Sequence, residues 1–151
     1  MIVPQFPTPN DQNPETWFKV FDKYKKEVDE DTILIGHSLG GTFTLKVLEK
    51  LETPIKAAYL VAAPIGIMPI RNYATDKPFL DHSFDWDKIK KNCKKFVVFH
   101  SDDDPFVCIE NAESMAKNLN ANFIHEKTAE HFNAGAGYTK FEDLLALISI
   151  D

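Results

Sequence analysis

The feature that most constrains the fold is a short run, Gly36-His37-Ser38-Leu39-Gly40, which stands between a strand-like and a helix-like segment. Residues 32–35 are rich in apolar and β-branched types, and residues 40–51 have helical spacing. A serine between glycines in a strand-turn-helix context is typical of a nucleophile elbow, in which the serine takes a strained backbone conformation. We expect the flanking glycines to be required, because a Cβ there would collide with the neighbouring strand and helix. The alternative is an ordinary glycine-rich turn.

Strand-like and helix-like segments alternate along the chain. Apolar runs at 56–61, 96–99 and 122–124 predict three further buried strands. Apolar stripes at helical spacing lie within 109–119 and 141–148, and Asn13-Pro14 begins a helix whose stripe extends to Val28. Strands that alternate with helices indicate a parallel sheet. We therefore predict one domain over residues 1–151, a three-layer α/β/α sandwich with a mostly parallel sheet of the α/β-hydrolase type.

The alternation lapses between Pro64 and Asp87, a stretch that contains prolines and several aromatic residues. We interpret it as an excursion over the edge of the sheet. Its residues Phe79, Phe84 and Trp86 are predicted to line an acyl or side-chain pocket. The equally weighted alternative is that these rings pack the excursion onto the core.

A serine nucleophile needs a base and a carboxylate that orients the base, and hydrolases with this elbow order them Ser, Asp, His. Asp104 ends an acidic run that follows the strand at 96–99 and is the predicted acid. His131 lies on the loop after the last strand and is the predicted base. Alternatives are a solvated or helix-capping acidic run and a histidine that only packs. A metal site at Asp102–Asp104 lacks the spacing of a calcium loop.

Charge and hydropathy restrict the partners. The chain has 23 acidic and 17 basic residues, a net charge of −6, which argues against nucleic acid as a partner. The longest apolar stretch, 57–70, is broken by prolines and is too short to span a membrane. The N-terminus has no basic-then-apolar signal. We expect a cytoplasmic protein, not associated with a membrane, whose substrate is a small molecule or a peptide.

Several segments beyond the serine motif carry a more specific likeness. Over essentially its whole length the sequence resembles the retinoblastoma-binding protein 9 / YdeN family of small serine hydrolases. The segments that carry the resemblance are Val3-Pro4-Gln5-Phe6-Pro7, Asn13-Pro14-Glu15-Thr16-Trp17, Gly36 to Gly41, Asp85 to Lys90, Ser101 to Phe106 and Glu130-His131-Phe132.

The resemblance implies a role for each matching residue. The nucleophile of the family falls on Ser38, its acid on Asp104 and its base on His131, the same three residues that chain order selects. It also implies hydrolysis of small esters or amides without a metal or an organic cofactor. One backbone donor for the oxyanion follows the nucleophile, at Leu39.

The sequence departs from the family at its beginning. Family members start with a strand and a His-Gly-x-x-Gly loop ahead of the segment that matches Ile2-Val3-Pro4, and this sequence has neither. We therefore expect an N-terminally truncated fold without one oxyanion donor and one inner strand, and favour a misassigned or truncated start over a deliberate fragment or a naturally shortened protein.

Our leading functional hypothesis is a hydrolase that forms an acyl-enzyme on Ser38. The alternative is a catalytically impaired hydrolase-fold protein that acts as a protein-binding module. Acyl transfer to an acceptor other than water is a third possibility.

Overall fold

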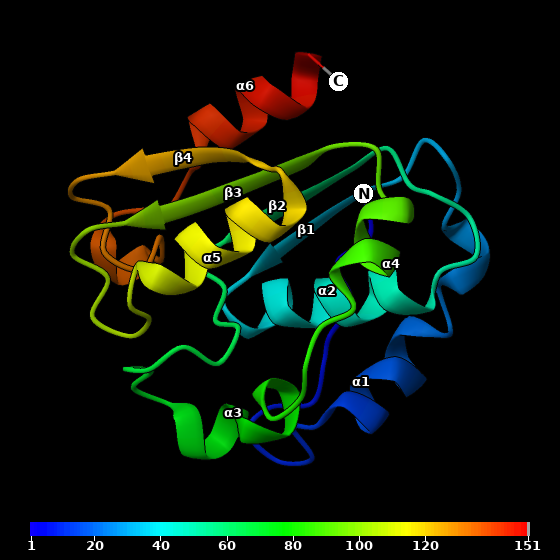
Figure 1. Ribbon diagram of the computed structural model, residues 1–151, viewed down its shortest axis with the longest axis horizontal. Coiled ribbons are helices and arrows are strands. Elements are labelled where there is room, and N and C mark those ends of the chain that lie inside the picture. Colours follow the sequence, from blue (N-terminus) through cyan, green and yellow to red (C-terminus); the bar gives the residue numbers. More distant parts are fainter. Residues whose placement is uncertain (151) are drawn as a thin grey trace.

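The centre of the molecule is a parallel sheet of four strands in the order β1-β2-β3-β4 (Figure 1). The computed structural model describes residues 1–150. All four predicted strands are confirmed, with three of them, β1, β3 and β4, extended by two residues at their carboxyl ends: β1 (Ile33–His37), β2 (Ala57–Val61), β3 (Phe96–Ser101) and β4 (Asn122–Glu126). The arrowheads all point the same way, so the loops that follow the strands gather at one end of the sheet.

Helices cover both faces of this sheet, which confirms the three-layer α/β/α prediction. In Figure 1 one face of the sheet is covered by α6 (Glu142–Ile150), which follows β4. The opposite face is covered by three helices from the connections between strands: α2 (Leu39–Lys50), α4 (Trp86–Lys91) and α5 (Glu110–Leu119).

The strands divide their side chains between two hydrophobic clusters. Ala58 and Leu60 of β2 belong to the cluster under α2 and α5, whereas Ala57 and Tyr59 belong to the cluster on the α6 face. This alternation follows from the two-residue period of a strand. Every residue of β2 and β3 is buried, so both faces need apolar side chains and the sequence reads as a continuous apolar run.

The N-terminal helix is shorter than predicted. As expected, the Asn13 side chain caps α1 (Pro14–Phe21) by accepting a hydrogen bond from the Thr16 N–H at 3.0 Å. The helix nevertheless ends at Phe21, and a 3₁₀ turn, η1 (Lys25–Glu27), follows. The apolar stripe to Val28 persists because a 3₁₀ turn also places residues three apart on one side.

The excursion after β2 differs from the prediction. It contains α3 (Tyr73–Leu80), which packs against α2, on the side of α2 away from the sheet, and not over the sheet edge (Figure 1). The ring of Phe79 lies 4.7 Å from that of Trp17 on α1. The apolar residues of this stretch are buried against the helix layer. The sequence pattern does not distinguish burial against helices from burial at the edge of a sheet.

The outer edge of β1 borders a groove. Among the described residues β1 hydrogen-bonds to β2 alone, and Ile35 in the middle of β1 is 51% exposed. The groove has a volume of about 690 Å³ and is lined by β1, by α2 and by the N-terminal residues Met1 to Pro4. This edge of the sheet is therefore open.

Candidate active site

Ser38 occupies the turn between β1 and α2. Its backbone dihedrals are φ 52° and ψ −126°, a conformation that L-residues rarely adopt. The Ser38 N–H donates to the Val61 carbonyl of β2 at 2.8 Å, which ties the strained turn to the neighbouring strand. The serine hydroxyl is thereby presented at the carboxyl end of the sheet, where ligands bind in open α/β sheets.

The prediction that the flanking glycines are required holds for Gly36 and is wrong for Gly40, whereas the next residue, Gly41, is required as well. A Cβ on Gly36 would come within 2.5 Å of backbone atoms of Gly40 and Gly41, and a Cβ on Gly41 would come within 2.5 Å of the Ala63 side chain. A Cβ on Gly40 would meet nothing within 4 Å. The elbow therefore needs Gly36 and Gly41, because strand and helix approach each other closely there.

Leu39, the predicted oxyanion donor, is the first residue of α2. The N–H groups in the first turn of a helix have no intrahelical partner, and the helix dipole favours negative charge at that end. The Leu39 N–H can therefore serve an anion that forms beside Ser38.

Asp104 lies on the loop after β3, and its side chain is only 1% exposed. One carboxylate oxygen, Oδ1, accepts hydrogen bonds from the backbone N–H groups of Phe106 at 2.8 Å and Val107 at 3.1 Å. The other, Oδ2, faces His131. Burial alone would raise the pKa of Asp104, but the hydrogen bonds from His131 and the two backbone groups outweigh it and lower that pKa below the ordinary value. Asp104 is thus held as an oriented carboxylate.

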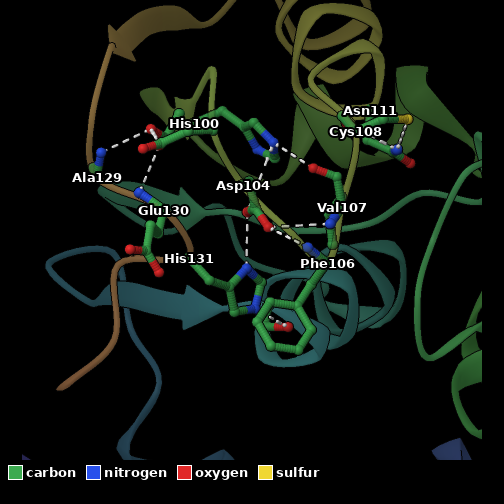
Figure 2. Close-up of polar contacts among 12 residues, drawn as sticks. His100, Asp104, Phe106, Val107, Cys108, Asn111, Ala129, Glu130 and His131 are labelled. Atoms are coloured by element: carbon green, nitrogen blue, oxygen red, sulfur yellow. Dashed lines mark hydrogen bonds and ion pairs between the residues drawn. The ribbon is translucent and has the colours of Figure 1, made fainter. Parts of the chain in front are cut away.

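His131 reaches both predicted partners (Figure 2). Its Nδ1 lies 2.8 Å from Asp104 Oδ2, and its Nε2 lies 3.0 Å from Ser38 Oγ. Because a carboxylate only accepts hydrogen bonds, the proton sits on Nδ1 and the lone pair of Nε2 faces the serine hydroxyl. The neighbours Glu130 (φ 43°) and Phe132 (φ 49°) both have left-handed backbone, a strained arrangement that turns the ring toward the sheet.

The residues of the acidic run all form hydrogen bonds or ion pairs, although Asp102 and Asp103 are also exposed to solvent. Four consecutive residues, from Ser101 at the end of β3 to Asp104 in the following loop, each bond to β4 or to the loop after it, and we call these contacts the loop zipper. Its four contacts are Ser101 Oγ accepting from Ala129 N at 2.9 Å, Asp102 Oδ1 at 2.5 Å from His125 Nε2, Asp103 Oδ1 accepting from Glu130 N at 2.8 Å, and Asp104 Oδ2 at 2.8 Å from His131 Nδ1. These contacts fix the end of β3 and its loop against the end of β4 and its loop, which places Asp104 beside His131.

Three further residues support the site, and sequence reasoning did not give them these contacts. His37, the residue directly before Ser38, lies with Nε2 2.7 Å from the backbone oxygen of His131. The Phe106 ring centroid lies 4.8 Å from that of His131. His100 is fully buried with Nε2 3.8 Å from Asp104 Oδ2, and burial lowers the pKa of its imidazole. Of these three residues, only His37 and Phe106 could have been suggested by the sequence, because they lie close to Ser38 and Asp104 in the chain.

The three aromatic residues predicted to line a pocket are not brought to Ser38. Phe79 is fully buried in the core beside Trp17. Phe84 and Trp86 pack against each other with ring centroids 5.1 Å apart, and Phe84 lies over Lys46, which is two turns along α2 from Ser38. The pocket prediction therefore needs correction, and the alternative, core packing, describes these contacts.

The described part of the chain contains neither a cluster of metal-ligating side chains nor a helix that could cross a membrane. Within residues 1–150 no group of three or more His, Cys, Asp or Glu side chains is arranged to hold a metal ion. Over the same residues no helix has the length and hydrophobicity needed to cross a membrane.

The chain is similar to known proteins over nearly its full length. The family model described as "Serine hydrolase" matches residues 5–149. The curated relatives include the serine hydrolase RBBP9 of Rattus norvegicus, 27% identical with 97% of this chain and 75% of that protein covered, and the putative hydrolase YdeN of Bacillus subtilis, 27% identical with 88% and 70% covered. These relatives favour a hydrolase over the alternative of a binding module.

A solved structure gives the same result for the fold. The crystal structure of the ydeN gene product from B. subtilis superposes with a TM-score of 0.87 at 25% identity, covering 97% of this chain and 81% of that one. The fold is therefore that of the α/β-hydrolases, and the resemblance drawn from the sequence motifs is confirmed. The chain belongs to the serine hydrolase family and is a relative of RBBP9 and YdeN.

Proposed function

We propose that this chain cleaves small esters or amides through an acyl-enzyme on Ser38. The observation that carries the proposal is the unbroken contact series from Asp104 through His131 to Ser38, with distances of 2.8 Å and 3.0 Å. A serine hydroxyl is a weak nucleophile, and a base within hydrogen-bond reach that is itself oriented by a carboxylate activates it.

In the acylation step Ser38 Oγ forms a bond to the substrate carbonyl carbon while its proton passes to His131 Nε2. The carbonyl oxygen becomes an oxyanion, which the Leu39 N–H stabilises. As the tetrahedral intermediate collapses, the bond to the leaving alcohol or amine breaks, and the leaving group takes the proton from Nε2. Asp104 keeps its negative charge throughout and stabilises the transient imidazolium.

In the deacylation step water replaces the leaving group. His131 Nε2 accepts a proton from the water as its oxygen attacks the acyl carbon. The intermediate then releases the carboxylic acid, and the proton returns from Nε2 to Ser38 Oγ. The free enzyme is regenerated without a change of oxidation state.

The test combines labelling by a fluorophosphonate probe with turnover of p-nitrophenyl acetate and butyrate. We expect the wild-type chain to be labelled and active, and Ser38→Ala to lose both properties while keeping its thermal unfolding transition. Ser83→Ala, an exposed serine in the loop before α4, is the matched control and should behave as wild type. A folded wild-type chain without labelling or turnover would contradict the proposal.

A further inference from the structure

The loop after β2 is fixed rigidly beside the candidate active site. Its anchor is Asn111 on α5, which has no exposed surface. The Asn111 Oδ1 accepts from the N–H groups of Ile65 at 2.9 Å and Ile67 at 3.0 Å, and its Nδ2 donates to the Ile67 carbonyl at 2.8 Å. A buried amide with satisfied donors and acceptors holds a loop in one conformation.

The far end of the same loop is joined to the loop that carries Asp104. Ile70 and Val107 form an antiparallel bridge, and the Arg71 N–H donates to the Phe106 carbonyl at 2.8 Å. The guanidinium carbon of Arg71 lies 5.2 Å from the centroid of the Phe106 ring. Figure 2 shows that ring beside the imidazole of His131, at 4.8 Å between centroids. Arg71 and His131 therefore contact the same ring.

The charge of Arg71 is available to a ligand. Its side chain is exposed, and no carboxylate within residues 1–150 forms an ion pair with it. It is the single arginine of the sequence, whose other 16 basic residues are lysines. Among the cation–ring contacts of the described residues, only that of Arg71 involves a ring that also touches His131.

The chemistry of arginine suits one kind of ligand. A guanidinium is planar, stacks on aromatic rings and presents paired N–H donors that match a carboxylate in bidentate geometry. Because the Phe106 contact orders the Arg71 side chain in advance, less conformational entropy is lost when a carboxylate binds.

We propose that Arg71 is a specificity-determining residue that favours ester substrates bearing a free carboxylate on the acyl chain. The inference rests on the proposed function, since it assigns the substrate class of the same site. The carboxylate pairs with the guanidinium while the ester carbonyl lies at Ser38.

The test compares two esters of equal chain length: the p-nitrophenyl monoester of adipic acid, which is anionic, and p-nitrophenyl hexanoate, which is neutral. The measured quantity is the ratio of kcat/KM for the anionic ester to that for the neutral ester. We expect Arg71→Met to lower this ratio about tenfold, mainly through a higher KM for the anionic ester, because a charged pair made equally in ground and transition states affects binding. Arg71→Lys keeps the positive charge but lacks the paired N–H donors of the guanidinium, and it should lower the ratio less than Arg71→Met does.

Lys117→Met, which removes one exposed positive charge on α5, is the matched control and should leave the ratio unchanged. Added salt should reduce the wild-type ratio. An Arg71→Met variant that loses activity toward both esters equally would overturn the inference, since Arg71 would then only support Phe106. An unchanged ratio would overturn it too, and both results leave the proposed function standing. Inactivity of the wild-type chain toward both esters would instead overturn the proposed function, and this inference with it.

Discussion

At the carboxyl ends of β3 and β4, the loop zipper joins four consecutive residues to the neighbouring strand and its loop, whereas the outer edge of β1 faces a groove of about 690 Å³. The first region is polar, and its buried carboxylate, Asp104, has partners for both oxygens. The second is apolar, with Ile35 half exposed. The candidate acid–base geometry therefore depends on the contacts at the carboxyl ends of β3 and β4, and β1 contributes to it through the contact of His37 with the His131 backbone.

The loop zipper contains one contact, between Asp104 and His131, whose removal should strongly reduce turnover. We expect Asp104→Asn to lower kcat for ester hydrolysis by about 10³–10⁴-fold, because an amide no longer holds His131 in the required tautomer. The measurement is steady-state turnover of p-nitrophenyl butyrate. Asp102→Asn makes the same change at the exposed pair with His125 and should cost less than about tenfold. Equal losses would mean that the whole loop zipper, rather than the contact between Asp104 and His131, sets the activity.

A second prediction concerns Gly36, at which β1 closely approaches the start of α2. Gly36→Ala places a Cβ within 2.5 Å of backbone atoms at the start of α2, so we expect a loss of about 3 kcal/mol in the free energy of unfolding. Denaturant unfolding followed by circular dichroism measures it. Gly40→Ala adds the same methyl group where nothing lies within 4 Å, and should leave the stability unchanged or raise it slightly. Similar losses in both variants would show that the elbow is uniformly crowded.

Acid should loosen the two regions at different pH. The folded-state pKa of Asp104 is lowered, so its contribution to stability is present above the ordinary pKa of aspartate and is lost as pH falls through the lower, folded-state value. We expect amide protons in residues 125–132 to lose protection from hydrogen exchange below about pH 4, before those of β1 and β2 do. Asp104→Asn should reduce this pH dependence, and the part that remains should come from Asp103, which accepts from the Glu130 N–H and whose pKa is also lowered. Simultaneous loss across the sheet would contradict the expected difference.

The smallest effect is expected at the open edge itself. Ile35→Lys places a charge on a half-exposed side chain and should change the free energy of unfolding by less than about 0.5 kcal/mol. Ile124→Lys in β4 is the matched comparison, because Ile124 packs against the cluster on the α6 face, and it should cost about 2 kcal/mol or more. Thermal unfolding of both variants measures the difference. A large cost at Ile35 would mean that the β1 edge is more ordered than its exposure indicates.

The sequence was sufficient to predict the strands, the layers and the three residues that meet at the candidate site. Each of these depends on a local signal: an apolar run, a glycine-flanked serine, or a polar residue just after a strand. Asp104 and His131 could be selected because chain order is fixed for this elbow. Their distances could not, since a contact across 27 residues has no local pattern.

Other features could not be predicted from the sequence, for similar physical reasons. The end of α1 at Phe21 was missed because apolar spacing records which side is buried and not which helix type buries it. Phe84 and Trp86 were assigned to a pocket because an aromatic residue in an irregular stretch has the same signature in a pocket and in a core. The contacts of Asn111 on α5 could not be predicted, because its partners Ile65 and Ile67 lie on a loop more than 40 residues earlier in the sequence.

The order of the strands in the sheet equals their order in the chain, and this has a consequence for biosynthesis. The elbow is complete once β2 has been made, since the Ser38 N–H bonds to the Val61 carbonyl. The imidazole that contacts Ser38 belongs to His131, which lies 93 residues after Ser38 in the chain. A ribosome therefore adds 70 further residues, from Val61 to His131 (131 − 61 = 70), before the Ser38 hydroxyl can contact the imidazole of His131.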